Sequence, residues 1–480
     1  MAREIELKLE VDPKHVANMR SHPLLSDEPR KSQQTSVYFD TSKGRLRRRG
    51  WVLRIRHDGD RWIQTIKHSG DSAGLFDRDE WESDVAGPQP DLQAIDGTPL
   101  HTRVSARQFH SLAPVLRTEV TRSTWVARHR GATIEITYDE GLVEAGGATE
   151  PIRELELELK AGNVGTLFAT AKRISANIPV KLGVLSKPER GFILADGRSG
   201  KPVKATHVDL NGKPSIADGF ATIVTACLKH FRLNEPLLIG RRDSEALHQL
   251  RVAVRRVRSA LWLFRPAVKD SEFTRASDRL RRFTRELGTA RNIDVILASL
   301  REDDPARDQL ERDRRLLYGR ILRKLNSRAF RNFVIGLLAW THSGEWRNGK
   351  KAGKPLIPFA KKRLDRLWHR IDKRAAELSQ LSDVERHQLR IDTKKIRYAL
   401  QFLEEPFRSA GSDQDEFADA AEGVQDSLGC LNDLATREAL IGQSALPWLI
   451  DMEAEQYLRA AKRHLRRLRK IGPYWRKARA

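Results

Sequence analysis

The sequence has few cysteines and lacks a long apolar run. Its two cysteines, Cys227 and Cys430, are too few for a disulfide framework or a thiolate zinc site. The first ten residues, MAREIELKLE, alternate charged and apolar side chains and so lack the apolar core of a signal peptide, and no later segment reaches the length of a membrane span. We therefore expect a protein that folds in water, resides in the cytoplasm and has no membrane partner.

Positive charge is concentrated in the second part of the chain. Residues 1 to 200 contain 30 Lys and Arg against 28 Asp and Glu, whereas residues 201 to 480 contain 57 against 36. A basic excess of this size favours a polyanionic partner. Residues 196 to 215, DGRSGKPVKATHVDLNGKPS, are rich in Gly, Pro and Ser and are typical of a linker. We predict one domain over residues 1 to 195 and a second over residues 216 to 480.

Charged and apolar residues alternate in many segments of the first domain. The period of two is that of a β-strand, and it occurs in EIELKLE, WVLRIR, WIQTIK, DEWESDV, TIEITYD and RELELELK. Turn sequences such as HDGD, HSGDSAG and EAGG separate several of these segments at hairpin distances, which favours antiparallel pairing. We predict a closed antiparallel β-barrel of the α+β class, whose apolar outer face is covered by helices such as one near residues 164 to 177.

The polar faces of these strands carry both signs of charge. A solvated face would explain any single segment, but the recurrence in five or six segments favours a polar lumen. In such a lumen Lys and Arg would bind phosphate oxygens and clustered carboxylates would hold a hard divalent cation, which suits phosphoryl transfer. The residues concerned are Glu4, Glu6, Lys8, Arg54, Arg56, Lys67, Arg78, Glu80, Glu82, Glu135, Glu154, Glu156 and Glu158.

EIELK, residues 4 to 8, resembles the ExExK signature that opens the CYTH family of triphosphate tunnel metalloenzymes. The resemblance covers residues 1 to about 195, because YFDTSKGRLRRRGWVLRIRHDGDRWIQTIK, RDEWE, RELELELK and VLSKPERGF follow in the order that the family shows. It implies an eight-stranded closed barrel, a triphosphate substrate and Mg²⁺ or Mn²⁺ as cofactor. Members of the family hydrolyse inorganic triphosphate or thiamine triphosphate, and some cyclise ATP to cyclic AMP.

The same resemblance implies roles for individual residues, carried over by their positions in the motifs. The predicted catalytic residues are Lys8, Glu4 and Glu6. The predicted metal ligands are Glu4, Glu6, Glu154, Glu156, Glu158 and Asp139. The predicted substrate-binding residues are Lys8, Arg54, Arg56, Lys67, Arg78, Arg117, Arg122, Lys187 and Arg190. Further acids of the tunnel are Glu80, Glu82 and Glu135.

The predicted reaction is hydrolysis of inorganic triphosphate to diphosphate and phosphate. Trp51, Trp62 and Trp81 could stack on an organic base, but each lies on or next to the apolar side of its strand, where core packing is the simpler interpretation. Three alternatives stay open: a thiamine triphosphatase, another enzyme that processes organic triphosphates, and a non-catalytic scaffold associated with polyphosphate.

The second domain shows the period of an α-helix. SEALHQLRVAVRRVRSALWLFR, residues 244 to 265, spaces its apolar residues by three and four, which gives one stripe on a helix. Next to the stripe lies a row of basic residues, here named the first ladder: His248, Arg251, Arg255 and Arg258. HQLRIDTKKIRYALQFL contains an equivalent row, the second ladder: His387, Arg390, Lys394 and Arg397. This internal repeat predicts two helical bundles related by a pseudo-twofold axis.

The ladders, with the later segments LGTARNID and LGCLND, resemble the CHAD family, an all-helical domain that often follows CYTH. The resemblance covers about residues 216 to 480 and implies two four-helix bundles, over about residues 216 to 345 and 346 to 480. It also implies that both ladders line a channel that binds long-chain polyphosphate, and polyphosphate granules are then a candidate location. Nucleic acid is the alternative polyanion, which we rank second because no helix-turn-helix, RNP or zinc-finger pattern is present.

Overall fold

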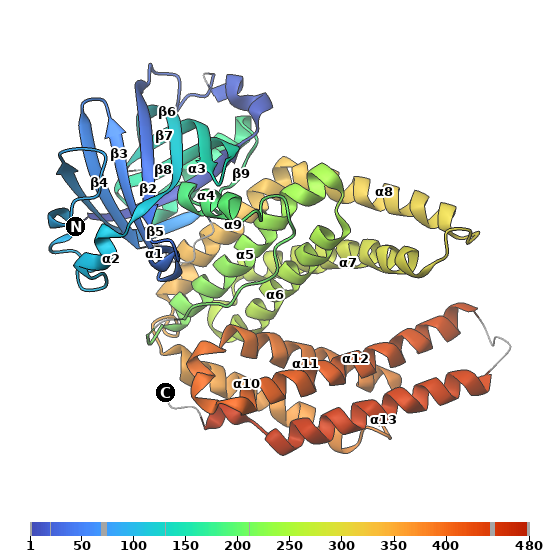
Figure 1. The fold of residues 1–480 in the computed structure, drawn as a ribbon. Helices are drawn as coiled ribbons and strands as arrows, with labels where there is room; N and C mark the ends of the chain where they lie inside the picture. Colours follow the sequence, from blue (N-terminus) through green and yellow to red (C-terminus); the bar gives the residue numbers. More distant parts are fainter. Residues whose placement is uncertain are drawn as a thin grey trace. The chain divides into compact units, whose positions relative to one another are not determined.

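The computed structural model describes residues 2–19, 21–68, 74–129, 131–210, 212–441 and 447–477. Figure 1 shows a β-barrel at the amino-terminal end, in blue to teal, and long helices from green to red. The chain divides into two compact units. The first comprises Met1–Ala205, Thr225–Val254 and Arg279–Gly344, and the second comprises Thr206–Val224, Arg255–Asp278 and Glu345–Ala480.

An antiparallel barrel of eight strands occupies the amino-terminal part of the first unit. The strands follow one another around the barrel in the order β5 (Leu75–Val85), β4 (Arg61–His68), β3 (Trp51–Asp58), β2 (Arg30–Asp40), β6 (Ala113–His129), β7 (Ala132–Ala145), β8 (Ala148–Ala161) and β1 (Ala2–Val11). The barrel closes because residues 2 to 7 of β1 pair with β5. The rest of β1 pairs with β8 and with the short β9 (Val180–Leu182). The predicted closed antiparallel barrel is confirmed.

The connection of β7 to β8 illustrates how the local sequence sets the pairing. Gly146 and Gly147 form a two-residue turn, and their φ angles are +59° and +74°. Two consecutive positive φ angles define the hairpin turn whose twist matches that of the flanking strands, and glycine adopts them without steric cost. The EAGG sequence therefore fixes both the turn and the register of the two strands.

The apolar core of the barrel lies outside its wall. Leu53 and Ile55 of β3 pack with Ile66 of β4, and Trp51 joins this cluster at 8% exposure. Trp62 and Trp81 pack against the same cluster, so all three tryptophans are core residues. The other elements of this region are η1 (Pro13–Met19), α1 (Arg45–Arg48), η2 (Gln93–Ile95), α2 (Ala106–His110), α3 (Val164–Asn177) and α4 (Lys187–Ala195).

The predicted all-α region begins at residue 216. Its first five helices are α5 (Ile216–Arg241), α6 (Ser244–Val268), α7 (Ser271–Ser299), α8 (Arg307–Asn326) and α9 (Arg328–Ser343). Within the first unit, Phe231 of α5, Phe283 of α7 and Phe330 of α9 pack together, with ring centroids 5.0 to 6.4 Å apart. Helix α9 also packs against α3 of the barrel region.

The second unit contains a four-helix bundle. Its helices are α10 (Leu356–Ala376), α11 (Asp383–Phe402), α12 (Ser412–Ile441) and α13 (Pro447–Ile471), with the short η3 (Glu345–Asn348), η4 (Glu405–Ala410) and η5 (Tyr474–Arg476). Each of the four packs against two others, in the ring α10–α11–α12–α13. Trp368, Phe417 and Trp475 form part of its core. The all-α prediction is confirmed, and none of the described helices combines the length and apolar character that a membrane span requires.

The predicted linker, residues 196–215, has neither helix nor strand among its described residues. In the first unit it is bonded to α5, because Asn234 accepts a hydrogen bond from the amide of Val203 and donates one to its carbonyl, both at 2.9 Å. His230 contacts the same carbonyl at 3.1 Å. This part of the segment is therefore fixed to the helix, and the domain boundaries drawn from composition stay a prediction.

Gly141 of β7 lies against the backbone of β6 without room for a side chain, and this provides a test of the barrel. A Cβ atom at this position would lie 1.9 Å from the carbonyl oxygen of Glu119. We expect Gly141→Ala to lower the free energy of unfolding by at least about 2 kcal/mol in chemical denaturation. The control is Gly87→Ala, whose Cβ would meet no atom within 4 Å and should cost less than about 0.5 kcal/mol. Equal stabilities would contradict the described approach of the two strands.

Candidate active site

The charged residues of the strands face the lumen of the barrel. On β1, Glu4, Glu6 and Lys8 line the cavity, whereas Leu7 and Leu9 have no exposed surface. Successive side chains of a strand point to opposite faces, and α3 packs on the outside of β1 and β8. The apolar face is therefore covered by helix, and the charged face is directed inward.

The lumen is a cavity of about 570 Å³, which is within the size range of small-molecule sites. Ten Lys and Arg and eight Asp and Glu line it. Tyr38 is the one aromatic residue among the lining residues that the structure describes. The cavity is thus suited to a highly charged ligand without an aromatic base.

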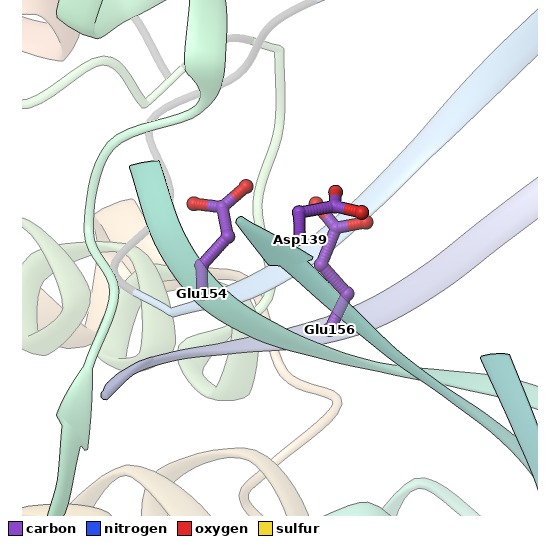
Figure 2. Close-up of side chains that lie close together, drawn as sticks. All are labelled: Asp139, Glu154 and Glu156. Carbon is purple, nitrogen blue, oxygen red and sulfur yellow. The ribbon is translucent and has the colours of Figure 1, made fainter. Parts of the chain in front are cut away.

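Three carboxylates, here named the acid cluster, lie together in the wall formed by β7 and β8 (Figure 2). One oxygen of each of Asp139, Glu154 and Glu156 lies within 4.8 Å of the others. Asp139 and Glu154 are directly opposite in the strand register and have no exposed surface, and Glu156 is 8% exposed. This spacing could hold a metal ion.

Basic residues of the chain itself already neutralise the acid cluster. The Nζ atom of Lys187 lies 2.7 Å from Asp139 and 3.0 Å from Glu156, and it also contacts Glu154. Arg122 donates two hydrogen bonds to Asp139, at 2.7 and 2.6 Å, and one to Glu156 at 2.9 Å. A metal ion at the acid cluster would therefore have to displace Lys187.

Opposite charges fix the ionisation of these residues. Burial would raise the pKa of Glu156, but Lys187, Lys8 and Arg122 outweigh burial and hold this pKa well below its usual value. Burial would lower the pKa of Lys8, but three neighbouring glutamates hold it above its usual value. The pKa of Asp139 is lowered despite burial by Lys187 and Arg122. These groups are consequently all charged at neutral pH.

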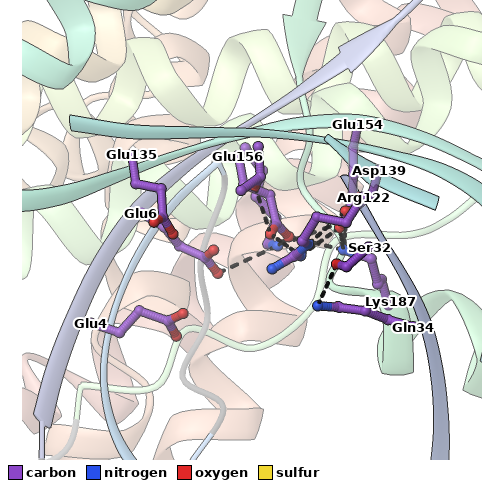
Figure 3. Close-up of polar contacts among 12 residues, drawn as sticks. Glu4, Glu6, Ser32, Gln34, Arg122, Glu135, Asp139, Glu154, Glu156 and Lys187 are labelled. Carbon is purple, nitrogen blue, oxygen red and sulfur yellow. Dashed lines mark hydrogen bonds and ion pairs between the residues drawn. The ribbon is translucent and has the colours of Figure 1, made fainter. Parts of the chain in front are cut away.

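A second set of carboxylates, here named the glutamate row, crosses β1, β8 and β7. Glu6 lies opposite Glu158, and Glu158 lies opposite Glu135. Burial is the main cause that raises the pKa of Glu6 and of Glu158, and neighbouring carboxylates raise both further. Figure 3 shows Glu6 and Glu135 on one side of the view, together with Glu4 and away from Lys187. Like charges on facing strands repel, so this row would gain from a bound cation.

Basic residues on β3, β4 and β5 pair with the tunnel acids. Lys67 lies 2.9 Å from Glu4 and 2.9 Å from Glu80. Arg78 lies 3.1 Å from Glu4 and 2.7 Å from Glu6. Burial opposes ionisation of Glu4, but Lys67 and Arg78 lower its pKa to about 2. Glu4 is thus held by two cations. The glutamate row also has basic neighbours, because Arg78 and Lys8 contact Glu6 and Lys160 lies 2.6 Å from Glu158 and 3.7 Å from Glu135.

Arg54 and Arg56 lie side by side on β3, and their surroundings differ, because neighbouring acids raise the pKa of Arg54 despite burial. Both lie near Glu82, at 3.5 and 3.2 Å. The repulsion by Arg54, followed by burial and by Arg122, lowers the pKa of Arg56. The Nε atoms of Arg54 and Arg56 are buried, and the described residues provide no hydrogen-bond acceptor for them. An anion in the lumen would supply the missing acceptors.

The structure places two predicted substrate-binding residues elsewhere. Arg117 is 51% exposed in its side chain and pairs with Glu119, because on β6 the even-numbered residues from Thr118 to Thr124 face the lumen. A residue five positions from Arg122 therefore points to the opposite face. Arg190 is not among the lining residues, since its guanidinium bonds to Glu10 at 3.0 Å.

Three further basic residues line the lumen that sequence reasoning missed: Arg30, Lys31 and Lys160. Lys160 continues the alternation of RELELELK, so the same periodicity could have identified it. Arg30 and Lys31 belong to RKSQQTS, in which no apolar residue marks the inner and outer faces. The sequence therefore contains no clear signal for these two.

The two ladders lie on α6 and α11. Leu247 and Leu250 beside the first ladder are fully buried, as the apolar stripe predicts. The ladder residues are half-buried, except His387, which is exposed. In the second unit, the ring of Tyr398 is 5.7 Å from the guanidinium of Arg255 and 5.4 Å from that of Arg397. One residue of each ladder therefore contacts the same ring.

Two known protein families match this chain. Residues 2–192 match the CYTH domain, and residues 222–442 match the CHAD domain. The chain carries a CYTH domain followed by a CHAD domain. The closed barrel is thus the CYTH domain, and the ladders lie on helices of the CHAD domain.

Individual relatives cover parts of the chain. A Haemophilus influenzae protein named inorganic triphosphatase is 28% identical over 199 residues, which are 40% of this chain and 55% of that protein. The match thus spans about half of that relative. The solved CHAD domain of the plant Ricinus communis is 25% identical, with 55% of this chain and 96% of that one covered and a TM-score of 0.45. A putative adenylyl cyclase from Hippeastrum, described as having a dominant triphosphatase activity, is 19% identical, with 41% and 96% covered and a TM-score of 0.33.

Arg122 and Arg117 of the CYTH domain provide a matched test of the site's electrostatics. We expect Arg122→Gln to lower the free energy of unfolding by about 3 kcal/mol, because it removes one of the cations that neutralise the buried carboxylates of Asp139 and Glu156. Arg117→Gln, on the exposed face of the same strand, should cost less than about 1 kcal/mol. Chemical denaturation at neutral pH measures both values. Similar losses for the two variants would contradict the inward placement of Arg122.

Proposed function

We propose that this chain is a metal-dependent triphosphatase that hydrolyses inorganic triphosphate to diphosphate and phosphate in the lumen of its CYTH domain. One observation carries the proposal: a single cavity contains Arg54 and Arg56, whose buried Nε–H groups lack an acceptor among the described residues, and a glutamate row whose carboxylates lie on facing strands. A phosphate chain bound together with a divalent cation satisfies both. The name of the Haemophilus influenzae relative, inorganic triphosphatase, supports the same reaction.

The basic side of the lumen would bind the phosphate chain. Arg54 and Arg56 would donate their buried Nε–H groups to phosphate oxygens, and Lys67 would add a third charge from the neighbouring strand. Water would attack the terminal phosphorus in line with the bond to the diphosphate, and this bond would break as the new P–O bond forms. The arginines would then stabilise the charge of the departing diphosphate.

The acid cluster has oxygens within 4.8 Å of one another, but Lys187 and Arg122 already bond to it, so the proposed place for a divalent cation is the glutamate row. Glu6, Glu158 and Glu135 offer oxygen ligands, which Mg²⁺ and Mn²⁺ prefer. When bound there, the cation would neutralise charge on the phosphate oxygens. Lys8 lies 3.4 Å from Glu6 and Arg78 lies 2.7 Å from it, so the Glu6 carboxylate is held between them.

An inorganic substrate is favoured over an organic one. The three tryptophans that could have stacked on a base lie in or against the outer core of the barrel. Among the described lining residues Tyr38 is the one aromatic, and Arg54 hydrogen-bonds to it. The lumen thus offers charge for a phosphate chain and little apolar surface for a nucleobase or thiamine.

The CHAD domain would bind long-chain polyphosphate along its ladders. The net charge of the chain is +23, and its basic excess lies in this part. The guanidinium groups of Arg255 and Arg397 converge on Tyr398, and the buried Nε atom of Arg255 has no acceptor among the described residues. Binding of a flexible polyanion to such a surface releases counterions and depends steeply on salt.

The triphosphatase proposal is tested by phosphate release from tripolyphosphate with the full chain. We expect activity with Mg²⁺ or Mn²⁺ and none with excess chelator, because the glutamate row then lacks its cation. Arg56→Met should lower kcat/KM by about 100-fold, since it removes a donor that stabilises the departing charge. Arg117→Met, whose side chain is outside the lumen, serves as the matched control and should retain the activity.

Two outcomes would contradict this proposal in different ways. Tight binding of tripolyphosphate without turnover in either metal would indicate a scaffold. Faster hydrolysis of thiamine triphosphate or ATP than of tripolyphosphate would indicate an organic substrate.

The polyphosphate proposal is tested by binding at several salt concentrations. Arg255→Met should weaken binding of long-chain polyphosphate and reduce the slope of log K against log salt by about one, because one phosphate contact is lost. Arg275→Met is the control, since Arg275 on α7 is 67% exposed in its side chain and pairs with Glu272. Tighter binding of single-stranded DNA than of polyphosphate under the same conditions would refute the proposed ligand.

A further inference from the structure

Within the first unit, helix α5 of the CHAD domain is bonded to α4 of the CYTH domain directly by one ion pair and indirectly by a second that runs through Glu10 of β1. Lys229 donates a hydrogen bond to Oε1 of Glu189 on α4 at 2.8 Å. Arg232 donates to one oxygen of Glu10 at 2.9 Å, and Arg190 of α4 donates to the other at 3.0 Å. Lys229 and Arg232 are three residues apart, so they lie on the same face of α5.

These ion pairs are part of a buried network. Arg232 is 3% exposed and also donates to the carbonyl of Leu182 in β9, at 2.9 Å. It pairs in addition with Glu235, which contacts Lys181 of β9 at 3.1 Å. Burial would raise the pKa of Glu189, but Lys229 outweighs burial and lowers it. A buried network with its charges paired has one favoured geometry, so α4 and β9 are held firmly against α5.

The first turn of α4 delivers Lys187 to the active site. The second oxygen of Glu189 accepts hydrogen bonds from the amide and the hydroxyl of Ser186, each at 2.8 Å. Ser186 is the N-cap of α4, and Lys187 is its first residue. The same carboxylate thus fixes the start of the helix on one side and bonds to Lys229 on the other. Lys187 extends from this fixed turn to the acid cluster.

We propose that Lys229 and Arg232 of the CHAD domain are positioning residues for the triphosphatase site, which act by holding Lys187 in place. They do not line the lumen; they fix the turn from which Lys187 reaches it. The inference rests on the proposed triphosphatase function. It adds that the CYTH domain needs α5 of the CHAD domain for full activity. An error of about 1 Å in the placement of a catalytic group can cost about 100-fold in rate.

A double-mutant cycle on the full chain tests this proposal. We expect Lys229→Met and Lys187→Met each to lower kcat/KM for tripolyphosphate by about 10-fold or more. Because Lys229 acts through Lys187, the double variant should be no worse than Lys187→Met alone. Lys229→Arg should retain most of the activity. The control is Arg241→Met on the same helix, which donates to the carbonyl of Gly200 at 3.3 Å and does not contact α4.

The possible results separate this inference from the proposed function. Multiplicative losses in the double variant, or wild-type activity in Lys229→Met, would overturn the positioning role. If the wild-type chain releases no phosphate, the triphosphatase proposal fails, and the cycle is then measured as tripolyphosphate affinity by calorimetry in chelator. If Lys229→Met does not fold, Glu189→Gln replaces it. The amide oxygen of glutamine can still accept the hydrogen bonds from Ser186, but the neutral side chain no longer attracts Lys229.

Discussion

A buried charge is stable only beside an opposite charge or a hydrogen-bonding partner, and this constraint governs the whole barrel. The strands direct nine basic and eight acidic side chains into one lumen, and Lys187 of α4 adds a tenth basic group. Lys187, Lys8 and Arg122 neutralise the acid cluster, and the outer apolar face supplies the packing that keeps the wall closed. These inward charges would destabilise the fold if they were unpaired, and they are also the candidate catalytic groups.

The charges of the lumen are not paired to the same degree everywhere. Within the acid cluster, basic neighbours lower the pKa of Asp139 and of Glu156 despite burial. Arg54 and Arg56 lack acceptors for their buried Nε–H groups among the described residues, whereas burial and neighbouring carboxylates raise the pKa of Glu6 and Glu158 in the glutamate row. A ligand that contains both phosphate and metal would satisfy both places at once, which explains why one cavity would select such a complex.

Most of the fold and much of the lumen could be predicted from the sequence, because β1 and β8 alternate charged and apolar residues without interruption. The inward side of β2 could not be predicted, since RKSQQTS contains no apolar residue to mark a face. The prediction that Arg117 binds the substrate was wrong, because the order of motifs along the chain does not determine which residues of a strand point inward. The contacts of Lys229 with Glu189 join distant residues by charge alone, and such pairs leave no periodic pattern in a sequence.

One edge of strand β1 pairs with two strands. Residues 2 to 7 pair with β5, and residues 9 to 11 pair with β9. The first half carries Glu4 and Glu6, and the second half carries Glu10, which bonds to Arg190 and Arg232. Loss or gain of a single residue between these halves would turn every preceding side chain to the other face. The length of β1 is therefore as important for the lumen as the identity of its charged residues.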